Sequence, residues 1–216
     1  MRYEAVADPS LASTSITLVE SCHTDTLPLV PYIYFHNAEF DTRANAFALG
    51  LAVLTQRYCG EVAEFDTPGV GLEFARAIEI VCPQVLSVGP IKGMDRTHSS
   101  GEVDIVCFPA RLGPPNWKGI GDLPLLPIDW SGDFVIPSTR SSTGYRQGRY
   151  VTTAALVASE TVTSIAIGLM HGGSLCRNLV VPITEDVKAG ELDGVRAALQ
   201  VVGVALSLVP CVPLRQ

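Results

Sequence analysis

The chain has 216 residues, of which 47% are hydrophobic and 17% charged, with a formal net charge of −7. This length suits a single domain spanning residues 1–216. The low charge and high apolar content argue against a disordered chain or a coiled coil. Because no cluster of Lys and Arg occurs, a surface that tracks nucleic-acid phosphates is not expected. The negative net charge fits a small ligand or a protein partner better than it fits a nucleic acid.

Two stretches, residues 151–170 and 195–209, are the most apolar of the chain. The first contains Glu160 with several Thr and Ser, and the second is shorter than the roughly 20 residues of a membrane-spanning helix. The first residues, Met-Arg-Tyr-Glu, lack the apolar core of a secretory signal. We therefore expect no membrane association and a cytoplasmic location.

The cysteines are scattered and contain no C-x-x-C pair, so neither a zinc knuckle nor a redox motif is indicated. They are Cys22, Cys59, Cys82, Cys107, Cys176 and Cys211. Each lies in or beside an apolar segment, which predicts buried free thiols.

Strands and helices alternate in the first part of the chain. Alternating or β-branched apolar runs predict strands, and apolar residues spaced near 3.6 predict helices. The expected strands are residues 15–20, 32–35, 61–65 and 85–88, and the expected helices are residues 44–57 and 72–81.

The middle of the chain, about residues 92–148, is rich in Gly, Pro and polar residues and predicts an irregular, loop-rich region. Strands are expected within it at 102–108 and 133–136. After it, the pattern predicts a helix at 150–160, a buried strand at 164–169, a strand at 179–183 and a helix at 191–201. This alternation favours an α/β fold with an open, mostly parallel, Rossmann-like sheet and helices on both faces.

Ligands of such folds bind in the loops that follow strands. The loop 36–42 lies between a strand and a helix, whose free N–H groups and dipole favour phosphate. The loop 138–149 places Arg140, Arg146 and Arg149 among hydroxyl groups, where they can clamp a phosphate or a carboxylate. A third loop, 171–174, follows the strand expected at 164–169.

Each of these residues also has a purely structural interpretation. Asp41 can cap the following helix, and Asn37 can be a turn residue. The arginines can be solvated or paired with acids. His171 can end a strand, whereas a functional histidine there would titrate near neutral pH.

Three common catalytic motifs are absent, namely Gly-x-Ser-x-Gly, the Walker-type phosphate loop and Gly-x-Gly-x-x-Gly. No motif therefore identifies the chain as a serine hydrolase, a P-loop NTPase or a dinucleotide-binding enzyme.

The order of the segments resembles the N-type ATP pyrophosphatases, the PP-loop superfamily, and within it the 7-cyano-7-deazaguanine synthase family. That family has a strand, an S-G-G-x-D-S loop and a helix. Here the strand at 32–35 leads to Asn37-Ala38-Glu39-Phe40-Asp41-Thr42 and a helix, with Asp41 identical and Thr42 a conservative match.

The resemblance continues in order over most of the chain. Residues 62–66 with 72–77 resemble the second strand and helix of the family, and residues 136–140 with Arg149 resemble its Pro-x-Arg-Asn region. Residues 165–168 resemble the next strand, and residues 203–211 resemble the run into the first zinc cysteine. The resemblance implies an adenine-nucleotide alpha-hydrolase-like fold.

The resemblance also implies a function. A PP-loop enzyme uses ATP and Mg²⁺ to adenylate a small carboxylate or carbonyl substrate, releases pyrophosphate and lets a nitrogen nucleophile attack. Carried over residue by residue, the catalytic positions are Asp41, Arg140 and Arg149, and the nucleotide-binding positions are Asn37, Ala38, Glu39, Thr42, Asp66 and Gly172.

The departures from the family are equally specific. Ala38 and Glu39 stand where paired glycines let the backbone wrap the pyrophosphate. A carboxylate about 4 Å from a phosphate charge costs about 4 kcal/mol at an effective dielectric constant near 20. No second cysteine lies near Cys211, so zinc is not expected.

Two interpretations stay open. The first is an ATP-dependent ligase-like or synthase-like enzyme with a degenerate phosphate loop. The second is a non-catalytic PP-loop relative that binds a ligand or a protein partner, as a homo-oligomer or in a hetero-complex.

Overall fold

The computed structural model describes residues 1–10, 13–27, 32–36, 40–65, 69–92, 103–109, 125–130, 149–152, 158–172, 176–185, 187–188 and 190–210, with the backbone alone at 36, 125–130 and 149–152. These residues form strands β1 (Arg2–Asp8), β2 (Ser13–Val19), β3 (Tyr32–His36), β4 (Val62–Phe65), β5 (Ser87–Gly89), β6 (Val103–Pro109), β7 (Leu125–Trp130), β8 (Arg149–Thr152), β9 (Cys176–Ile183) and β10 (Ala205–Pro210). The helices are α1 (Asn45–Thr55), α2 (Leu72–Val81), α3 (Glu160–Gly172) and α4 (Asp193–Val201).

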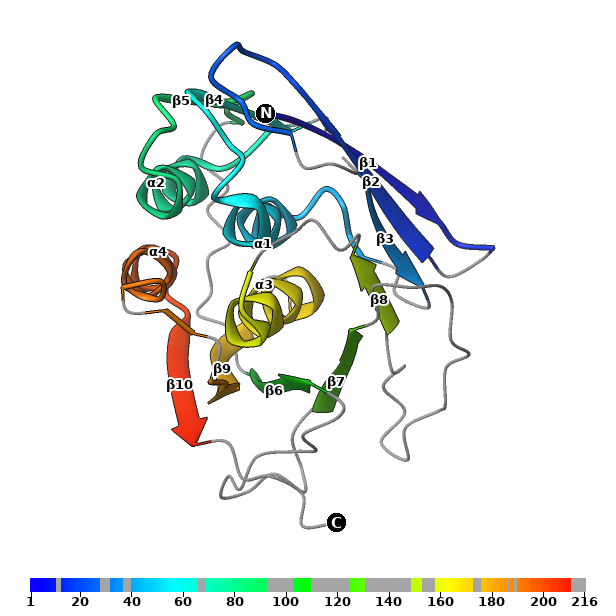
Figure 1. Cartoon of the computed structure of the whole chain (residues 1–216), viewed down its shortest axis with the longest axis vertical. Coiled ribbons are helices and arrows are strands. Elements are labelled where there is room, and N and C mark those ends of the chain that lie inside the picture. The colour runs from blue at the N-terminus through cyan, green and yellow to red at the C-terminus, as the bar shows by residue number, and fades with distance from the viewer. Residues whose placement is uncertain are drawn as a thin grey trace.

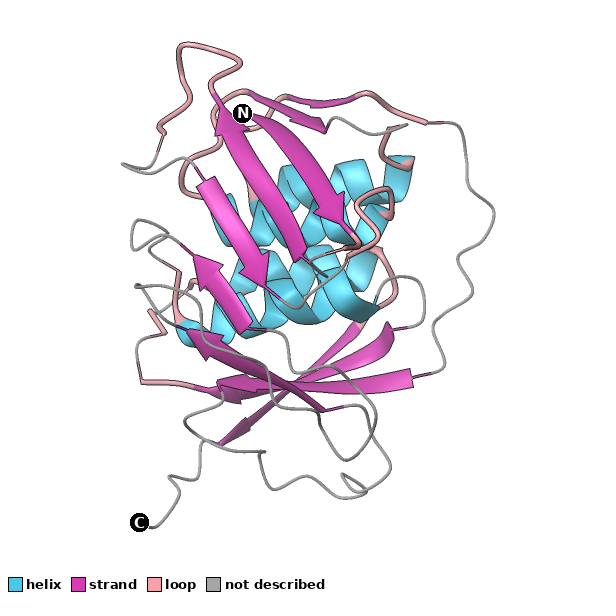
Figure 2. Ribbon diagram, turned by 90° about the vertical axis from the view of Figure 1, so that its right-hand side faces the viewer, coloured by secondary structure: helices cyan, strands magenta, loops and turns pink. Residues whose placement is uncertain are grey.

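The strands form one strongly curved sheet in the order β10-β9-β6-β7-β8-β3-β2-β1-β4-β5. A first arm of five strands, β3-β2-β1-β4-β5, faces a second arm, β6-β9-β10, across the helices (Figures 1 and 2). β8 and β7 join the arms. The first residues of β7 pair with β6, and its last two, Asp129 and Trp130, pair with β8, so the sheet turns at β7.

The fold is α/β, as expected, and its sheet is mixed. Six of the nine pairs of neighbouring strands are parallel, and the antiparallel pairs are β1–β2, β2–β3 and β3–β8. Because of those antiparallel pairs, β1, β3, β4 and β5 run opposite to the other six strands. The carboxyl ends of the strands therefore lie at two opposite edges rather than at one.

The described helices all lie on the concave side of the sheet (Figure 1). α1 and α3 occupy the centre between the arms, and α2 packs against α4 at the open side. The expected covering of both faces by helices is therefore not seen in the described residues. The curvature explains the difference, since one concave face buries helices from two sides at once.

α1 and α3 approach closely because α1 has a glycine at the contact. A Cβ on Gly50 would lie 2.6 Å from Met170 Cγ and 2.7 Å from the Ala166 carbonyl oxygen. Ten of the eleven residues of α1 are buried, as are eleven of the thirteen of α3. This helix pair is the centre of the hydrophobic core.

Two predictions from the sequence are wrong. The strand expected at 164–169 lies inside α3, which is apolar on all sides because α1 covers one side and β6 and β9 cover the other. A helix buried all round loses the periodicity that distinguishes it from a strand. The second wrong prediction is the helix expected at 150–160. Residues 149–152 form strand β8 instead, and α3 begins only at Glu160.

Other elements are confirmed or were missed. α2 has the predicted bounds, and β2, β3, α1, β4, β6, β9 and α4 agree within a few residues. β5 is shifted to 87–89, and β1, β7 and β10 were not predicted. The strand expected at 133–136 lies outside the described residues. No helix in the described part of the chain has the length and hydropathy that crossing a membrane requires.

Candidate functional site

The starts of α1 and α2 meet at one end of the fold. The N–H of Gly71, the residue before α2, donates to Asn45 Oδ1 at 2.9 Å, and Asn45 is the first residue of α1. The ring of Phe40 meets the ring of His171 edge-on, with centroids 4.8 Å apart, so the end of α3 lies there too. We call this region the helix-start end.

One predicted site residue outside the loop itself, Arg149, has its backbone at the helix-start end. The β3–β8 register places Arg149 opposite His36, where the chain leaves β3 towards the expected phosphate loop. Phe65, the last residue of β4, directly precedes Asp66. The remaining predicted positions, Asn37, Ala38, Glu39, Asp66, Arg140 and Arg146, lie outside the described residues.

Asp41 orders a turn before α1. Its Oδ1 accepts the N–H of Arg43 at 3.0 Å, and its carbonyl accepts the N–H of Ala44 at 3.0 Å. The helix N-cap is Ala44, which makes no side-chain hydrogen bond, and the first turn of α1 has no acidic residue. The interpretation of Asp41 as the N-cap is therefore wrong. Thr42 is half-buried beside it.

A second segment supports the start of α2. The N–H of Val70 donates to the Pro90 carbonyl at 2.8 Å, and the N–H of Lys92 donates to the Val70 carbonyl at 3.1 Å. Gly69 has φ +107°, and a Cβ there would lie 2.7 Å from the Pro90 carbonyl oxygen. This turn therefore requires glycine, and it brings the cationic residue Lys92 to the helix-start end.

Gly172 and His171 end α3 instead of following a strand. A Cβ on Gly172 would lie 2.6 Å from Ile105 Cδ1 and 2.7 Å from Cys176 Cβ, so the glycine allows α3 to pack on β6 and β9. Burial lowers the pKa of His171 to about 4. His171 is therefore neutral at pH 7, and the titration near neutral pH expected of a functional histidine is not found.

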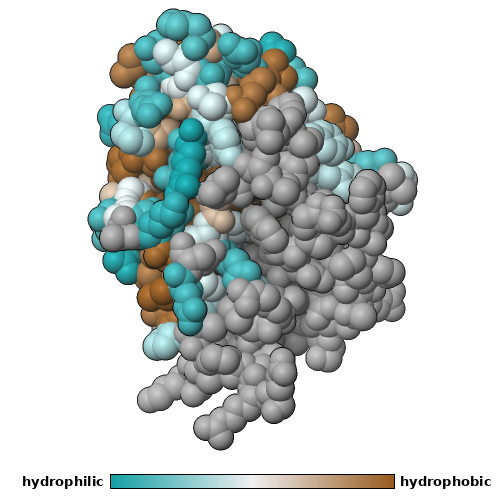
Figure 3. Space-filling view, viewed as in Figure 1, coloured by the Kyte–Doolittle hydropathy of each residue, from teal (hydrophilic) through white to brown (hydrophobic). Residues whose placement is uncertain are grey.

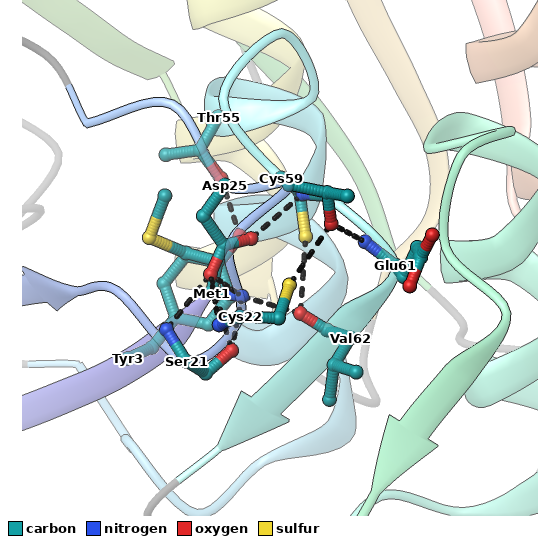
Figure 4. Close-up of polar contacts among 11 residues, drawn as sticks. Met1, Tyr3, Ser21, Cys22, Asp25, Thr55, Cys59, Glu61 and Val62 are labelled. Atoms are coloured by element: carbon teal, nitrogen blue, oxygen red, sulfur yellow. Dashed lines mark hydrogen bonds and ion pairs between the residues drawn. The ribbon is translucent and has the colours of Figure 1, made fainter.

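A second polar group lies at the opposite end of α1 (Figure 4). The Asp25 carboxylate pairs with the Met1 ammonium at 2.6 Å, and neither group is exposed. Oδ2 also accepts the N–H groups of Ser21 at 2.8 Å and Cys22 at 3.1 Å, and Oδ1 accepts that of Gly60 at 2.8 Å. Burial opposes ionisation, but these donors outweigh it and hold the pKa of Asp25 well below its usual value.

Three cysteines adjoin this group, which we call the Asp25 cluster. Cys22 Sγ lies 3.1 Å from Thr24 Oγ1, and this hydrogen bond lowers the pKa of Cys22. Contact with the Cys82 thiol lowers the pKa of Cys59, and burial is outweighed there. The same contact, with burial, raises the pKa of Cys82 well above its usual value.

No spacing in the sequence predicts the Asp25 cluster, because its members lie at residues 1–3, 21–25, 55–62 and 82. The prediction of buried free thiols is confirmed for Cys59, Cys82, Cys107 and Cys176. Cys22 is free but only half-buried. Cys211 lies outside the described residues.

In the described ranges, no three His, Cys, Asp or Glu residues are grouped so that they could hold a metal ion. Comparison of the chain with protein-family models, with curated proteins and with solved structures finds no match.

Proposed function

We propose that the helix-start end binds the phosphates of an adenine nucleotide, in a diverged PP-loop protein with a Rossmann-like nucleotide-binding half. The unit β3-α1-β4-α2-β5 supports this proposal, since three strands of one direction are linked by two helices. The observation that carries it is the meeting of two helix starts, one of them without a side-chain cap or an acidic first turn.

The chemistry of this end suits an anion. The first N–H groups of an α-helix have no partner within the helix, and the helix dipole places partial positive charge there. Arg149, the first residue of β8, pairs with His36 at the end of β3, and Lys92 follows the bridge between Val70 and Ile91, so the backbones of two cationic residues belong to the same end. Phosphate oxygens would accept the N–H groups of α1 and would be neutralised by these cations.

Arg149 takes its proposed role from this geometry, whereas Arg140, outside the described residues, takes its role from the family resemblance. Arg149 and Arg140 would balance the negative charge that develops on departing pyrophosphate. Asp41 would hold the turn before α1, because its Oδ1 is engaged by the N–H of Arg43. The exposed Asp41 carboxylate would help to hold Mg²⁺, which would neutralise phosphate charge when bound. The proposed reaction is adenylation of a small carboxylate or carbonyl substrate, followed by attack of a nitrogen nucleophile.

The activity test is release of pyrophosphate from ATP in the presence of Mg²⁺, a panel of small carboxylic acids and ammonia. The account expects release above background that Arg149→Ala reduces. Arg57→Ala is the matched control, because Arg57 pairs with Glu191 beyond the other end of α1. Background release from folded protein with every acid would exclude the catalytic form of the proposal.

A second candidate is a non-catalytic relative that acts as an interaction subunit. Leu72 and Ile80 on α2 and Val201 on α4 are 40%, 37% and 40% exposed. Figure 3 shows hydrophobic residues interleaved with hydrophilic ones along the side where α2 and α4 lie. This candidate predicts an oligomer by light scattering that Ile80→Asp dissociates, with stability indifferent to ATP. A monomer at all concentrations would contradict it.

A further inference from the structure

Three cysteines adjoin the Asp25 cluster, which the proposed nucleotide site does not use; Cys22 and Cys59 are labelled in Figure 4, and Cys82 contacts Cys59. Cys22 follows β2, Cys59 precedes β4, and Cys82 ends α2. Cys59 and Cys82 are 2% and 1% exposed, whereas Cys22 is half-buried. A small oxidant in solution therefore meets Cys22 first.

Cys22 is surrounded by hydrogen-bond donors. Its Sγ lies 3.1 Å from Thr24 Oγ1, and that oxygen also accepts the N–H of Glu61 at 3.1 Å. The N–H groups of Thr24, Glu61 and Val62 add weaker hydrogen bonds to the sulfur. These donors stabilise the thiolate, which is the form of cysteine that attacks oxidants.

Cys59 lies against the same residue of β4 that Cys22 touches. The Cys59 thiol donates to the Val62 carbonyl at 3.7 Å, while the Val62 N–H points at Cys22 Sγ. Figure 4 labels Cys22, Cys59 and Val62 in the same close-up, and Val62 is the residue that both cysteines share. Asp25 ties the two backbones together, because its carboxylate accepts the N–H groups of both Cys22 and Gly60.

Cys59 is itself prepared as a second nucleophile. Contact with Cys82 lowers its pKa most, and the Met1 ammonium and the Tyr3 hydroxyl act in the same direction, against burial and the Asp25 carboxylate. By contrast, burial dominates at the remaining described thiols, which lie under α3, although a backbone hydrogen bond from Asn178 opposes it at Cys176. Burial raises the pKa of Cys107 well above its usual value and that of Cys176 to about 12. These two thiols therefore serve as unreactive references.

We propose that Cys22 and Cys59 form a peroxide-reactive dithiol that closes into an intramolecular disulfide. The Cys22 thiolate attacks one oxygen of a hydroperoxide, the O–O bond breaks, and the departing oxygen takes a proton and leaves as water or an alcohol. The Cys59 thiolate then attacks the sulfenic sulfur of Cys22. The S–O bond breaks, the S–S bond forms, and hydroxide takes a proton and leaves as water. The two thiols are oxidised, one hydroperoxide is reduced, and a thiol reductant restores the dithiol.

The test treats the reduced full chain with hydrogen peroxide, blocks remaining thiols with N-ethylmaleimide and maps the peptides by mass spectrometry. The expected product is a Cys22–Cys59 disulfide that dithiothreitol removes. Cys22→Ser abolishes it, and Cys59→Ser leaves a Cys22 sulfenic acid that dimedone traps. Cys176→Ala reacts as the unaltered chain does. A Cys59–Cys82 disulfide, oxidation of Cys22 without a disulfide, or no reaction in the folded protein overturns the proposal.

The rate of the peroxide reaction shows whether Cys22 reacts because the Thr24 hydroxyl activates it or only because it is exposed. Thr24→Val removes the hydroxyl at Cys22, and the peroxide reaction slows about tenfold if the pKa of the thiol rises by one unit. Thr26→Val changes an exposed threonine of the same loop and leaves the rate unchanged. Equal rates for the two variants, with circular dichroism showing both folded, contradict the proposed activation of Cys22.

Discussion

The hydrogen-bond donors that lie near the two ends of α1 have different acceptors. At the C-terminal end, the N–H groups of Ser21, Cys22 and Gly60 and the Met1 ammonium converge on the buried Asp25 carboxylate. At the N-terminal end, no side chain caps the helix and no acidic residue occupies its first turn. The first end supplies its own anion, and the second offers donors to an anion from outside.

This difference separates a structural network from a binding site. A buried carboxylate that accepts hydrogen bonds from several donors lowers the free energy of the folded state. Those donors are then occupied and cannot bind a ligand. A helix start without a capping side chain keeps its N–H groups for water or for a ligand. Each substitution below changes one contact at an end or at the middle of α1, and each is compared with a matched control substitution.

The largest effect is expected from Asp25→Ala. Removing the carboxylate leaves the Met1 ammonium without its charged partner in a site with no solvent exposure. Breaking a buried ion pair in this way costs about 3–5 kcal/mol. Equilibrium unfolding in urea measures the loss of free energy of unfolding.

The matched control is Asp8→Ala. The Asp8 carboxylate accepts the N–H and the hydroxyl of Ser10 at the surface, at 2.9 and 2.5 Å. We expect a cost of about 1 kcal/mol or less there. Equal losses for Asp8→Ala and Asp25→Ala would remove the distinction between the two kinds of carboxylate.

A pH dependence is expected from His171 at the helix-start end. Its pKa is about 4 in the folded protein because of burial, against 6.5 for an unperturbed histidine. The unfolded chain therefore binds the proton first as the pH falls. Stability is full above about pH 6.5 and is lost progressively towards about pH 4, by about 3 kcal/mol in total.

Urea midpoints measured across that pH range test this expectation. His171→Phe keeps a ring against Phe40 and removes the titration, so its stability falls less on acidification. His23→Gln, at an exposed position, is measured alongside it as the histidine control. A His171→Phe profile as steep as that of the unaltered chain would show that other groups cause the loss.

A smaller effect is expected where α1 packs on α3. In Gly50→Ala the new Cβ meets a backbone oxygen, that of Ala166, at 2.7 Å, so a helix must move. In Gly168→Ala it meets the side-chain ends Cys107 Sγ and Leu179 Cδ2, both at 2.8 Å, which can shift. We expect about 2–3 kcal/mol for the first and about 1 kcal/mol for the second, within the range for overpacked cores. Thermal unfolding of both variants checks the order, and a reversed order would contradict the rigid contact.

The sequence predicted α2, which has one apolar face, within its bounds, but it failed for α3, which is apolar on nearly every side. α2 exposes Glu73 and Glu79 opposite buried Phe74 and Ile78, and its bounds were predicted correctly. α3 is buried on nearly every side, so residues 164–169 gave a strand pattern. The arrangement of Arg149 beside His36 follows from the β3–β8 register, which no local pattern contains.

The Asp25 cluster was not predictable for a related reason. Its donors come from residues 1, 21–22 and 60, and only the folding of β1 between β2 and β4 brings them together. The five described cysteines were correctly expected to be free, but the hydroxyl of Thr24 at Cys22 depends on the turn that follows β2.

The central claim is that the helix-start end binds nucleotide phosphates, and the thermal unfolding midpoint with and without saturating Mg-ATP tests it most directly. At about 100 times its Kd, a ligand of the folded state adds about 2.7 kcal/mol, which raises the midpoint of a domain of this size by about 2–4 °C. The account predicts this rise with Mg-ATP, a smaller rise with AMP, loss of the rise in Arg149→Ala and its retention in Arg57→Ala. An unchanged midpoint with both nucleotides would contradict it.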